Sequence, residues 1–370
     1  MARPLPSPGT APGRANLFGL ERDGLAARLA DLTSRRFHAD QIFHWMYGRL
    51  EQDPGAMTDL PAKLRGTIGG RFRVAWPEVA EWRDSADGSR KYVLRLEDGG
   101  EIEAVHIVHG SRATLCLSSQ IGCALQCRFC LTGSMGLVRN LTPGEILGQV
   151  AVLARAHSLV PNGYRVVFMG MGEPLHNYDA VLAAFRILVD PSGFALAPRR
   201  VTLSTAGLVS GIDRLAAESP RPRLAVSLAA ADDRLRDDLM PINRSFDLEH
   251  LMDACRRFPL GPRERVTFEY PLIDTVNDRP EDAVRLARLL RGVRAKVNVI
   301  PYNEAGVAEF RTPSEERAGR FRDALKSRGV GATIRWSKGR DIGAACGQLV
   351  RAGAGRRTPD GRQAAPRHSD

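Results

Sequence analysis

Residues 116–130 read CLSSQIGCALQCRFC and contain four of the six cysteines of the chain. Three of them, Cys123, Cys127 and Cys130, follow one another at the spacing Cys-x3-Cys-x2-Cys. Iron–sulfur clusters are normally held by four thiolates, so three local thiolates leave one iron open to an external ligand. An open position is what a catalytic metal site requires. The spacing therefore predicts a metal centre on a loop that the neighbouring glycines allow to turn tightly.

Zinc is the competing metal, because Cys-x2-Cys pairs are common zinc ligands. A zinc site usually adds a second cysteine pair or a nearby histidine, and neither follows here. Disulfides are disfavoured because the first 14 residues lack the apolar core of an export signal. No segment approaches the about 18 consecutive apolar residues of a membrane helix. We therefore expect a cytoplasmic protein without a membrane partner.

Short apolar segments that alternate with longer ones occupy the chain beyond the cysteine loop. This alternation predicts an α/β fold with a parallel sheet. Six such units are too few for an eight-stranded TIM barrel, so we expect a partial (β/α)6 barrel. The expected strands are Thr114–Leu117, Tyr164–Phe168, Arg200–Ser204, Arg223–Ser227, Arg265–Tyr270 and Lys296–Ile300. Cys116, residues 170–174, Ser204, Ser227 and Asn303 lie at or just past the ends of these strands, so the pattern predicts one site at that rim.

A small helical region precedes the barrel. Leu25, Leu29 and Leu32 are spaced as on one helix face, and further helices are expected over residues 38–50 and after Pro61. Two strands joined by a glycine turn should follow, at Lys91–Leu96 and Ile102–Val108. The expected division is a disordered tail at 1–15, a helical RNA-binding domain at 16–75, a β-hairpin extension at 76–110, the barrel at 111–349, and a disordered basic tail at 350–370.

The net charge of +11 and the isoelectric point near 9.8 suit a polyanionic partner. A genome that favours arginine, alanine and glycine codons would give a similar composition. Basic and aromatic residues lie close together in the helical region, which is typical of RNA binding. The aromatics could equally form the core of that region. The residues concerned are Arg35, Arg36, Phe43, Trp45, Tyr47 and Arg49.

The three-cysteine spacing resembles the signature of the radical S-adenosylmethionine superfamily. In that family a [4Fe–4S] cluster binds S-adenosylmethionine at its open iron, and reduction yields a 5′-deoxyadenosyl radical. Residues 170–174, GMGEP, resemble the family's glycine–glutamate segment, which accepts hydrogen bonds from the methionine amino group. Residues 112–127 and 341–349 further resemble the RlmN/Cfr family of RNA adenine methyltransferases. The likeness extends from about Leu17 to Leu349.

The resemblance implies roles for residues outside the cluster. Cys346 matches the cysteine that takes a methyl group from one S-adenosylmethionine, while a second molecule supplies the radical. The methylene radical would then add to adenine, and Cys116 matches the cysteine that releases this adduct through a transient disulfide. Glu103 matches the proton acceptor, a role in which its surroundings would have to tune its pKa. Without the resemblance, Cys116 would be interpreted as a small buried apolar residue and Glu103 as a solvent-facing one. Cys255 matches no motif of the family and is expected to be structural.

The resemblance also implies the cofactor pocket and the partners. The residues carried over for S-adenosylmethionine are Gly172, Glu173, Ser204, Ser227, Leu228, Ala229 and Asn303. Ala229 departs from the family, which usually has histidine there, so only a backbone contact is expected from it. The implied partners are 23S rRNA, tRNA as a second candidate substrate, and an electron donor such as flavodoxin or ferredoxin. The target adenine must leave its stack to reach the rim of a barrel.

Three functions fit these motifs. The first is methylation of adenine C2, and the second is Cfr-like methylation of C8, which uses the same motifs. The substantial N-terminal region favours C2. The third is a non-catalytic iron–sulfur or zinc protein that binds RNA. That function has no need of Cys346, Cys116 or the GMGE segment, and all three are present.

Overall fold

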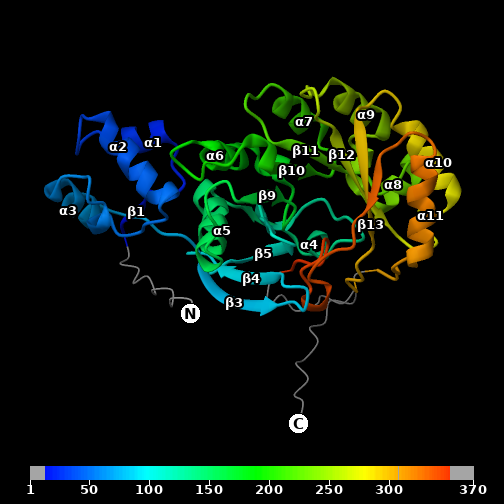
Figure 1. Cartoon of the computed structure of the whole chain (residues 1–370), viewed down its shortest axis with the longest axis horizontal. Coiled ribbons are helices and arrows are strands. Elements are labelled where there is room, and N and C mark those ends of the chain that lie inside the picture. The colour runs from blue at the N-terminus through cyan, green and yellow to red at the C-terminus, as the bar shows by residue number, and fades with distance from the viewer. Residues whose placement is uncertain (1–12, 307, 351–370) are drawn as a thin grey trace, which may run out of the picture.

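A computed structural model describes residues 13–306 and 308–350, and its centre is a curved ten-stranded sheet (Figure 1). The strands follow the order β14-β13-β12-β11-β10-β9-β6-β5-β4-β3. The seven strands from β14 to β6 in this order run parallel to one another. They are β6 (Arg112–Cys116), β9 (Tyr164–Phe168), β10 (Val201–Thr205), β11 (Arg223–Ser227), β12 (Val266–Leu272), β13 (Ala295–Pro301) and β14 (Ala332–Ile334).

The prediction of a partial barrel is confirmed. The six expected strands lie in sequence order along the sheet, each within two residues of its expected ends. Strands buried on both faces are nearly continuous apolar runs, which makes them recognisable. β14 adds a short parallel strand at one edge, and its three residues are too few for a sequence signal.

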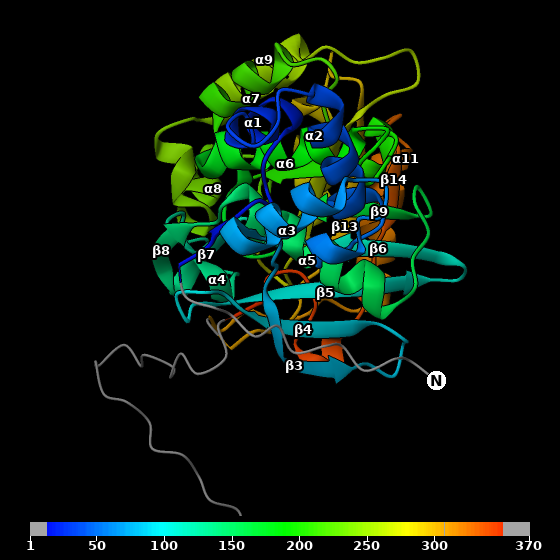
Figure 2. The ribbon, with the colours of Figure 1, turned by 90° about the vertical axis from the view of Figure 1, so that its left-hand side faces the viewer.

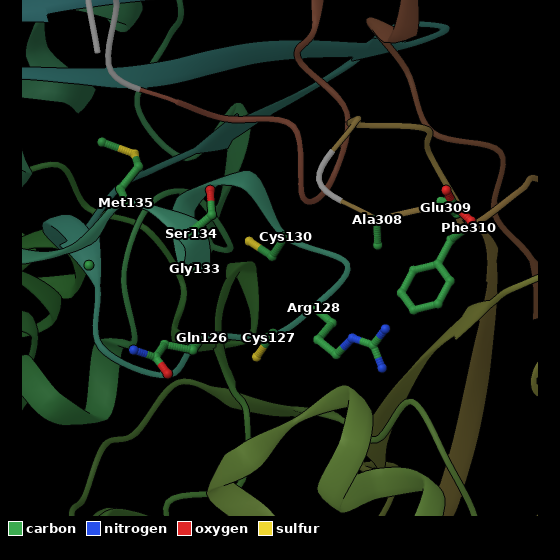
Figure 3. A pocket seen from close by; sticks show the side chains of 11 residues that line it. Gln126, Cys127, Arg128, Cys130, Gly133, Ser134, Met135, Ala308, Glu309 and Phe310 are labelled. Atoms are coloured by element: carbon green, nitrogen blue, oxygen red, sulfur yellow. The ribbon is translucent and has the colours of Figure 1, made fainter. Parts of the chain in front are cut away.

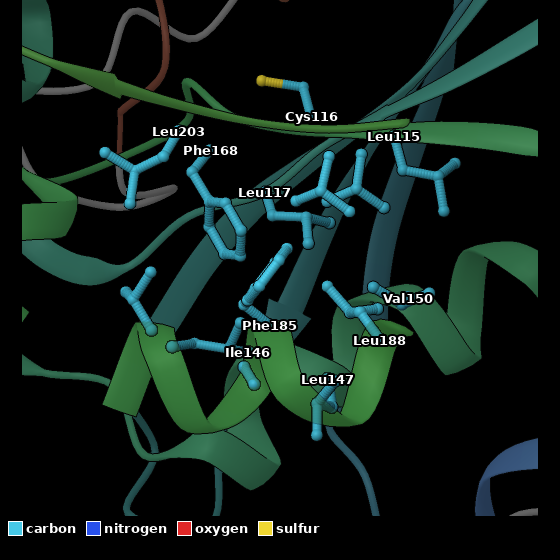
Figure 4. Close-up of a cluster of buried hydrophobic side chains, with 14 of the residues drawn as sticks. Leu115, Cys116, Leu117, Ile146, Leu147, Val150, Phe168, Phe185, Leu188 and Leu203 are labelled. Atoms are coloured by element: carbon cyan, nitrogen blue, oxygen red, sulfur yellow. The ribbon is translucent and has the colours of Figure 1, made fainter. Parts of the chain in front are cut away.

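Helices cover the convex face of the sheet (Figure 1). They are α5 (Pro143–Ala156), α6 (Tyr178–Val189), α7 (Val209–Ala216), α8 (Asp233–Leu239), α9 (Leu248–Arg257), α10 (Pro280–Leu289) and α11 (Glu315–Lys326), with the short turns η3 (Pro174–Asn177), η4 (Pro198–Arg200), η5 (Pro241–Arg244) and η6 (Arg340–Ile342). Leu115 and Leu117 of the β6 segment and Phe168 of β9 pack against Phe185 of α6 (Figure 4). Cys116 points to the opposite side of its strand, into the concave face (Figure 4).

The extension before the barrel is three strands rather than the expected hairpin. β3 (Glu78–Asp84), β4 (Arg90–Arg95) and β5 (Glu101–His109) are antiparallel, and β5 pairs antiparallel with β6, so they continue the barrel sheet. β3 reads EVAEWRD and is mostly exposed at the sheet edge. It therefore lacks the apolar alternation by which a half-buried strand is recognised.

The N-terminal region packs at one end of the barrel, and Figure 2, viewed from that end, shows its helices in front. Its elements are β1 (Ala15–Asn16), α1 (Arg22–Arg28), α2 (Arg36–Phe43), η1 (His44–Gly48), η2 (Pro54–Ala56), α3 (Ala62–Arg71) and β2 (Phe72–Arg73). The helix expected over 38–50 is divided, because the α-helix ends at Phe43 and a wider π turn follows. Residues 1–12 and 351–370, in which most of the two expected tails fall, lie outside the described residues.

The aromatic residues proposed to bind RNA in this region are buried. Phe43, Trp45 and Tyr47 are at most 8% exposed, and Trp45 Nε1 donates a hydrogen bond to Asp59 at 2.6 Å. The interpretation of these rings as an RNA-stacking surface is therefore wrong, and they form the core of the helical region. Across the described part of the chain, no helix is long and apolar enough to cross a membrane.

Candidate active site

A small antiparallel ribbon holds the cysteine loop. β7 (Gln120–Cys123) pairs with β8 (Gly136–Asn140), and the short helix α4 (Leu131–Ser134) follows the third cysteine. Gly122 has a φ of +76°, and a Cβ atom there would lie 1.8 Å from the carbonyl oxygen of Gly136. Only glycine fits this position, so the residue before Cys123 is dictated by the close approach of the two strands.

The cysteine loop separates two cavities. An open cavity of about 760 Å³ lies on its outer side, and Cys127, Arg128 and Cys130 line it (Figure 3). An inner cavity of about 170 Å³ lies between the loop and the concave face of the sheet. It is lined by Cys123, Cys127, Cys130, Gly172, Glu173, Ser204, Ser227, Asn303 and Cys346 among the residues predicted from the sequence. The larger cavity is the more open one, but the inner cavity brings the expected chemistry together.

The three cysteine side chains of the loop lie in surroundings that raise their pKa values. Burial raises the pKa of Cys123 to about 12, and burial together with the neighbouring thiolates raises that of Cys127. Burial also raises the pKa of Cys130. Positive iron would offset this cost of holding thiolates. Among the described residues, no three His, Cys, Asp or Glu side chains lie close enough to bind a single ion. The thiolates of an iron–sulfur cluster bind different irons, so they need not converge on one ion.

The GMGEP segment crosses the floor of the inner cavity. Gly172 has a φ of +99°, and a Cβ atom there would lie 2.6 Å from Cβ of Gln120. Glu173 is 3% exposed, and its carboxylate accepts hydrogen bonds from the backbone N–H groups of Leu175 at 3.0 Å and Ala206 at 2.8 Å. Burial raises the pKa of Glu173 to about 6. The carboxylate is thus fixed in place with lone pairs left to accept from a ligand.

Buried polar side chains beneath this segment were not predicted individually. Gln120 accepts a hydrogen bond from the N–H of Glu173 at 2.8 Å, and Ser118 Oγ accepts one from the N–H of Met171 at 2.9 Å. Gln149 of α5 exchanges hydrogen bonds with both backbone groups of Ser118. A polar residue in an otherwise apolar helix, such as Gln149, was the available signal.

Leu228 and Ala229 do not line the inner cavity. Both are fully buried, and Ala229 adopts a positive φ of 59°. Asn277 donates a hydrogen bond to the Ala229 carbonyl at 2.7 Å. Arg236, also fully buried, donates to the carbonyls of Leu228 and Ala206 at 3.1 and 2.6 Å. This role of Arg236 was not predictable from local pattern, because the residue lies in the highly charged segment DRLRDDL, which is typical of an exposed helix.

The loop that carries Cys346 is anchored on both sides of the cavity. Asp341 accepts hydrogen bonds from Ser85 Oγ at 2.7 Å and from the Ala86 N–H at 3.0 Å, in the turn between β3 and β4. On the other side, the Leu131 N–H donates to the Gly347 carbonyl at 2.8 Å. Asn303 Nδ2 donates to the Cys346 carbonyl at 3.2 Å. The extension and the cysteine loop therefore hold Cys346 at the inner cavity.

Glu103 lies behind this loop and does not line the inner cavity. It is 3% exposed, so the solvent-facing interpretation is wrong. One carboxylate oxygen pairs with Lys91 Nζ at 2.9 Å, and the other accepts a hydrogen bond from the Val350 N–H at 2.9 Å. Lys91 also donates to the Gly343 carbonyl at 3.1 Å. Burial raises the pKa of Glu103 although Lys91 opposes that shift. The pair holds both ends of the Cys346 loop.

The remaining three cysteines lie in different surroundings. Cys116 is buried on the concave face, and burial, followed by the nearby Cys346 thiolate, raises its pKa. Cys346 is exposed, and partial enclosure by the cavity raises its pKa to about 11, with Glu269 as the next cause. Glu269, which was not predicted, lines the inner cavity and accepts a hydrogen bond from Asn298 at 2.8 Å. Cys255 is buried in α9 and lines neither of the two cavities.

Known proteins share both parts of this architecture. Residues 117–287 match the family model of the radical SAM superfamily, and residues 15–74 match that of the ribosomal RNA large subunit methyltransferase N-terminal domain. The dual-specificity RNA methyltransferase RlmN of Syntrophotalea carbinolica is 51% identical over 91% of this chain and 90% of that protein. The protein of the same name from Rhodospirillum rubrum is 46% identical over 91% of this chain and 81% of its own. A crystal structure of a radical SAM methyltransferase from Sphaerobacter thermophilus, 45% identical, covers 90% of this chain and 99% of its own, with a TM-score of 0.85.

Proposed function

The chain belongs to the RlmN family of radical S-adenosylmethionine RNA methyltransferases, and we propose that it methylates C2 of an adenine in 23S rRNA and in tRNA through Cys346. The observation that carries this proposal is the position of Cys346 on the inner cavity, together with the three cluster cysteines and Glu173. A protein that only bound RNA would have no use for a fourth thiol at that place. The same cavity residues would serve C8 methylation, and the RlmN relatives favour C2.

The donor set fits the implied cofactors. Cys123, Cys127 and Cys130 would hold a [4Fe–4S] cluster, which with bound S-adenosylmethionine supplies a 5′-deoxyadenosyl radical. Glu173 and Gly172 would receive the methionine end of the ligand, and Ser204, Ser227 and Asn303 offer further hydrogen-bonding groups on the cavity wall. Leu228 and Ala229 lie behind that wall, so their proposed contribution is through the backbone. One-electron reduction requires an external donor such as flavodoxin or ferredoxin.

Cys346 is proposed to carry the methyl group. Its thiol loses a proton, and its sulfur takes the methyl of one S-adenosylmethionine as the bond from that carbon to the sulfonium breaks. A second S-adenosylmethionine is consumed in the radical step, so each turnover uses two. The methyl carbon on Cys346 would lose one hydrogen atom, which ends in 5′-deoxyadenosine, and would then bond to C2 of adenine; the ring would return one electron to the cluster and lose its own hydrogen as a proton. Exposure of Cys346 to the cavity is what this covalent step needs.

Cys116 is proposed to release the product. Its thiolate attacks the sulfur of Cys346, a disulfide forms, and the bond between that sulfur and the methylene carbon breaks toward the carbon. The carbon takes a proton and becomes the methyl group of the base, and an external thiol reductant must later return the two electrons. Glu103 remains the proposed acceptor of the ring proton. Because both its oxygens are engaged here, that role requires the Val350 end of the loop to move.

The test is anaerobic reconstitution with iron, sulfide, S-adenosylmethionine, reductant and an rRNA fragment, followed by mass spectrometry of the base and assay of 5′-deoxyadenosine. Cys123→Ala should form no 5′-deoxyadenosine above background. Cys116→Ala should accumulate a covalent protein–RNA adduct. Cys255→Ala, which removes a buried thiol outside the site, is the matched control and should turn over normally. Full turnover by Cys346→Ala would refute the proposal, and 8-methyladenine as product would replace C2 by C8.

A further inference from the structure

The concave face of the barrel carries positive charge near the strand beginnings. On β9, Arg165 and Val167 share a face because side chains alternate along a strand. Val167 is the register partner of both Cys116 and Thr202, and Thr202 is the partner of Arg223. Register partners on neighbouring strands point to the same face. Arg165 and Arg223 therefore share the concave face with Cys116.

The same alternation and register place residues of β11, β12 and β13 on the concave face. Arg223 and Ala225 share a face of β11, and Ala225 is the register partner of Thr267. Thr267 in turn is the partner of Lys296 and lies two residues before Glu269 on the same face. The concave face thus has the reaction groups toward the strand ends and cations toward the strand beginnings.

Six cations lie on and around this face, and each of them is Arg165, Lys296 or a charge that acts on one of these two; we call them the inner basic cluster. Burial and then four surrounding arginines lower the pKa of Arg165, and burial and Arg335 lower that of Lys296. The members of the cluster are Arg112, Arg165, Arg200, Arg223, Lys296 and Arg335. All are exposed except Arg200, which is half-buried and whose Nε has no hydrogen-bond partner.

The cluster lacks partners within the described residues. None of its six members takes part in the ion pairs of that part of the chain. Glu269 is the one acid that acts on Lys296, and it lies at the inner cavity. Like charges held together without acids destabilise the free protein. Such an arrangement is understandable if an anionic ligand neutralises it.

Positive charge extends from the inner basic cluster toward Cys346. Arg335 is a charge neighbour of both Glu269 and Cys346, so positive charge continues from the strand beginnings to the methyl-carrying thiol. Trp336, next to Arg335 in sequence, is 38% exposed. Single-stranded RNA is typically bound by cations on its phosphates and by aromatic rings on its bases.

We propose that substrate RNA enters the barrel from the end at which its strands begin, with its phosphates on the inner basic cluster and the target adenine passing Arg335 to reach Cys346. This inference rests on the proposed function and names the surface that delivers the substrate. An extruded base needs a path into the barrel and charge that holds the flanking backbone. The inner basic cluster offers that charge on the same face as Cys116.

The test compares two variants that lose the same charge. Arg165→Gln/Arg223→Gln/Lys296→Gln removes three members of the cluster, none of which lines the inner cavity. Arg234→Gln/Arg288→Gln/Arg291→Gln removes three exposed arginines on or just after α8 and α10, on the convex side. Binding of a fluorescent rRNA loop is measured by anisotropy at several salt concentrations. The variant has lost three contacts to single-stranded RNA, so its affinity should depend less on salt. Between about 50 and about 200 mM salt, the loss of affinity should be roughly 20-fold greater for wild type than for the cluster variant.

The controls separate this inference from the proposed function. The cluster variant should still form 5′-deoxyadenosine and methylate Cys346 without RNA, since neither step needs the cluster. A salt slope equal to that of the convex-side variant would overturn the inference. A second result would also overturn it: unchanged RNA binding together with loss of reduction of the protein by a flavodoxin. The cluster would then bind the acidic electron donor rather than RNA. Failure of wild type to methylate RNA would instead refute the proposed function.

A second measurement needs no substitution. Wild-type protein is crosslinked by light to RNA that carries 4-thiouridine beside the target adenine, and the attached peptides are sequenced. Crosslinks should map to the beginnings of β9, β11 or β13, or near Trp336. Crosslinks confined to residues 15–74 would overturn the inference even if the triple variant failed to fold.

Discussion

The N-terminal helical region and the concave face of the barrel are both rich in cations, but they use them in opposite ways. Four arginines of the helical region pair with acids, Arg28 and Arg49 lie over aromatic rings, and the buried aromatic rings form the core of the region. The pairs are Arg22 with Asp40 and Asp190, Arg36 with Asp23, Arg71 with Asp31, and Arg73 with Glu97. The inner basic cluster has no such pairs. A net charge of +11 is therefore a poor guide to where a polyanion binds, because paired cations contribute little field.

Two ion pairs of the helical region, Arg22 with Asp190 and Arg73 with Glu97, connect it to the rest of the molecule. Arg22 binds both oxygens of Asp190 at 2.7 Å, and Asp190 follows α6. Tyr47 packs on Phe194 with ring centroids 5.9 Å apart. Gly19 approaches Gly144 so closely that a Cβ atom would lie 2.5 Å from the Gly144 nitrogen. This region is thus docked on the barrel through charge pairs and close packing, and its contribution to RNA binding is proposed to be secondary.

The largest expected effect comes from the one buried ion pair of the Cys346 loop. Lys91→Met should leave Glu103 buried without its partner, which typically costs about 3–5 kcal/mol of unfolding free energy. It also removes the hydrogen bond to the Gly343 carbonyl, so methylation of Cys346 should slow. Urea unfolding and mass analysis of the Cys346 peptide measure both effects.

The matched control lies between the same two strands. Arg95→Gln breaks the Arg95–Glu101 pair, which is partly exposed and 3.2 Å long, and should cost no more than about 1 kcal/mol. If Lys91→Met were no worse than Arg95→Gln, the pair would not position the loop. Glu103 would then be free to act only as a proton acceptor.

What the sequence could predict depended on the range of the contacts involved. The cluster cysteines and GMGEP are local spacings, and the barrel strands are local apolar runs, so both were recognisable. The Lys91–Glu103 pair depends on the register between β4 and β5, which places Glu103 opposite Val93 and beside Lys91. The inner basic cluster depends on the register of successive strands far apart in sequence. Neither register is written in any local pattern.

The next largest effect should come from Arg22, and it tests the comparison directly. Arg22→Gln removes charged hydrogen bonds to Asp190 and Asp40, and because these side chains are partly exposed we expect a loss of about 1.5–3 kcal/mol in total. Thermal unfolding should occur earlier, whereas the salt dependence of RNA binding should stay unchanged. The exposed pair of Arg36 provides the control, and Arg36→Gln should have little effect on either measurement. A shallower RNA salt slope in Arg22→Gln, similar to that from a cation of the inner basic cluster, would break the contrast between the two regions.

The smallest expected effect concerns a place where the protein excludes positive charge. His106 of β5 and His157, at the end of α5, stack with ring centroids 3.6 Å apart, and His157 shares a 2.8 Å hydrogen bond with the Tyr92 hydroxyl. Both ring nitrogens of His106 are buried without a partner. Burial, then His106, then Arg90 lower the pKa of His157 to about 4, and Asp84 opposes this only in part. Burial and Arg90 also lower the pKa of His106.

The direction of the pH effect follows from these shifts. The unfolded chain takes up protons on these histidines near pH 6.5, whereas folded His157 does so only near pH 4. This contribution to stability is therefore fully present above about pH 6.5 and should decline as the pH falls toward 4. Uptake of one full proton on unfolding would change the unfolding free energy by about 1.4 kcal/mol per pH unit. The expected change is smaller because His157 is only half-buried. Urea unfolding from pH 7 to 4.5 should show a flatter decline for His157→Gln than for wild type. His250→Gln is a control of opposite sign, because Asp247 raises the pKa of His250 and its loss should make the decline slightly steeper. Equal slopes for wild type and His157→Gln would show that the stacked pair does not oppose protonation.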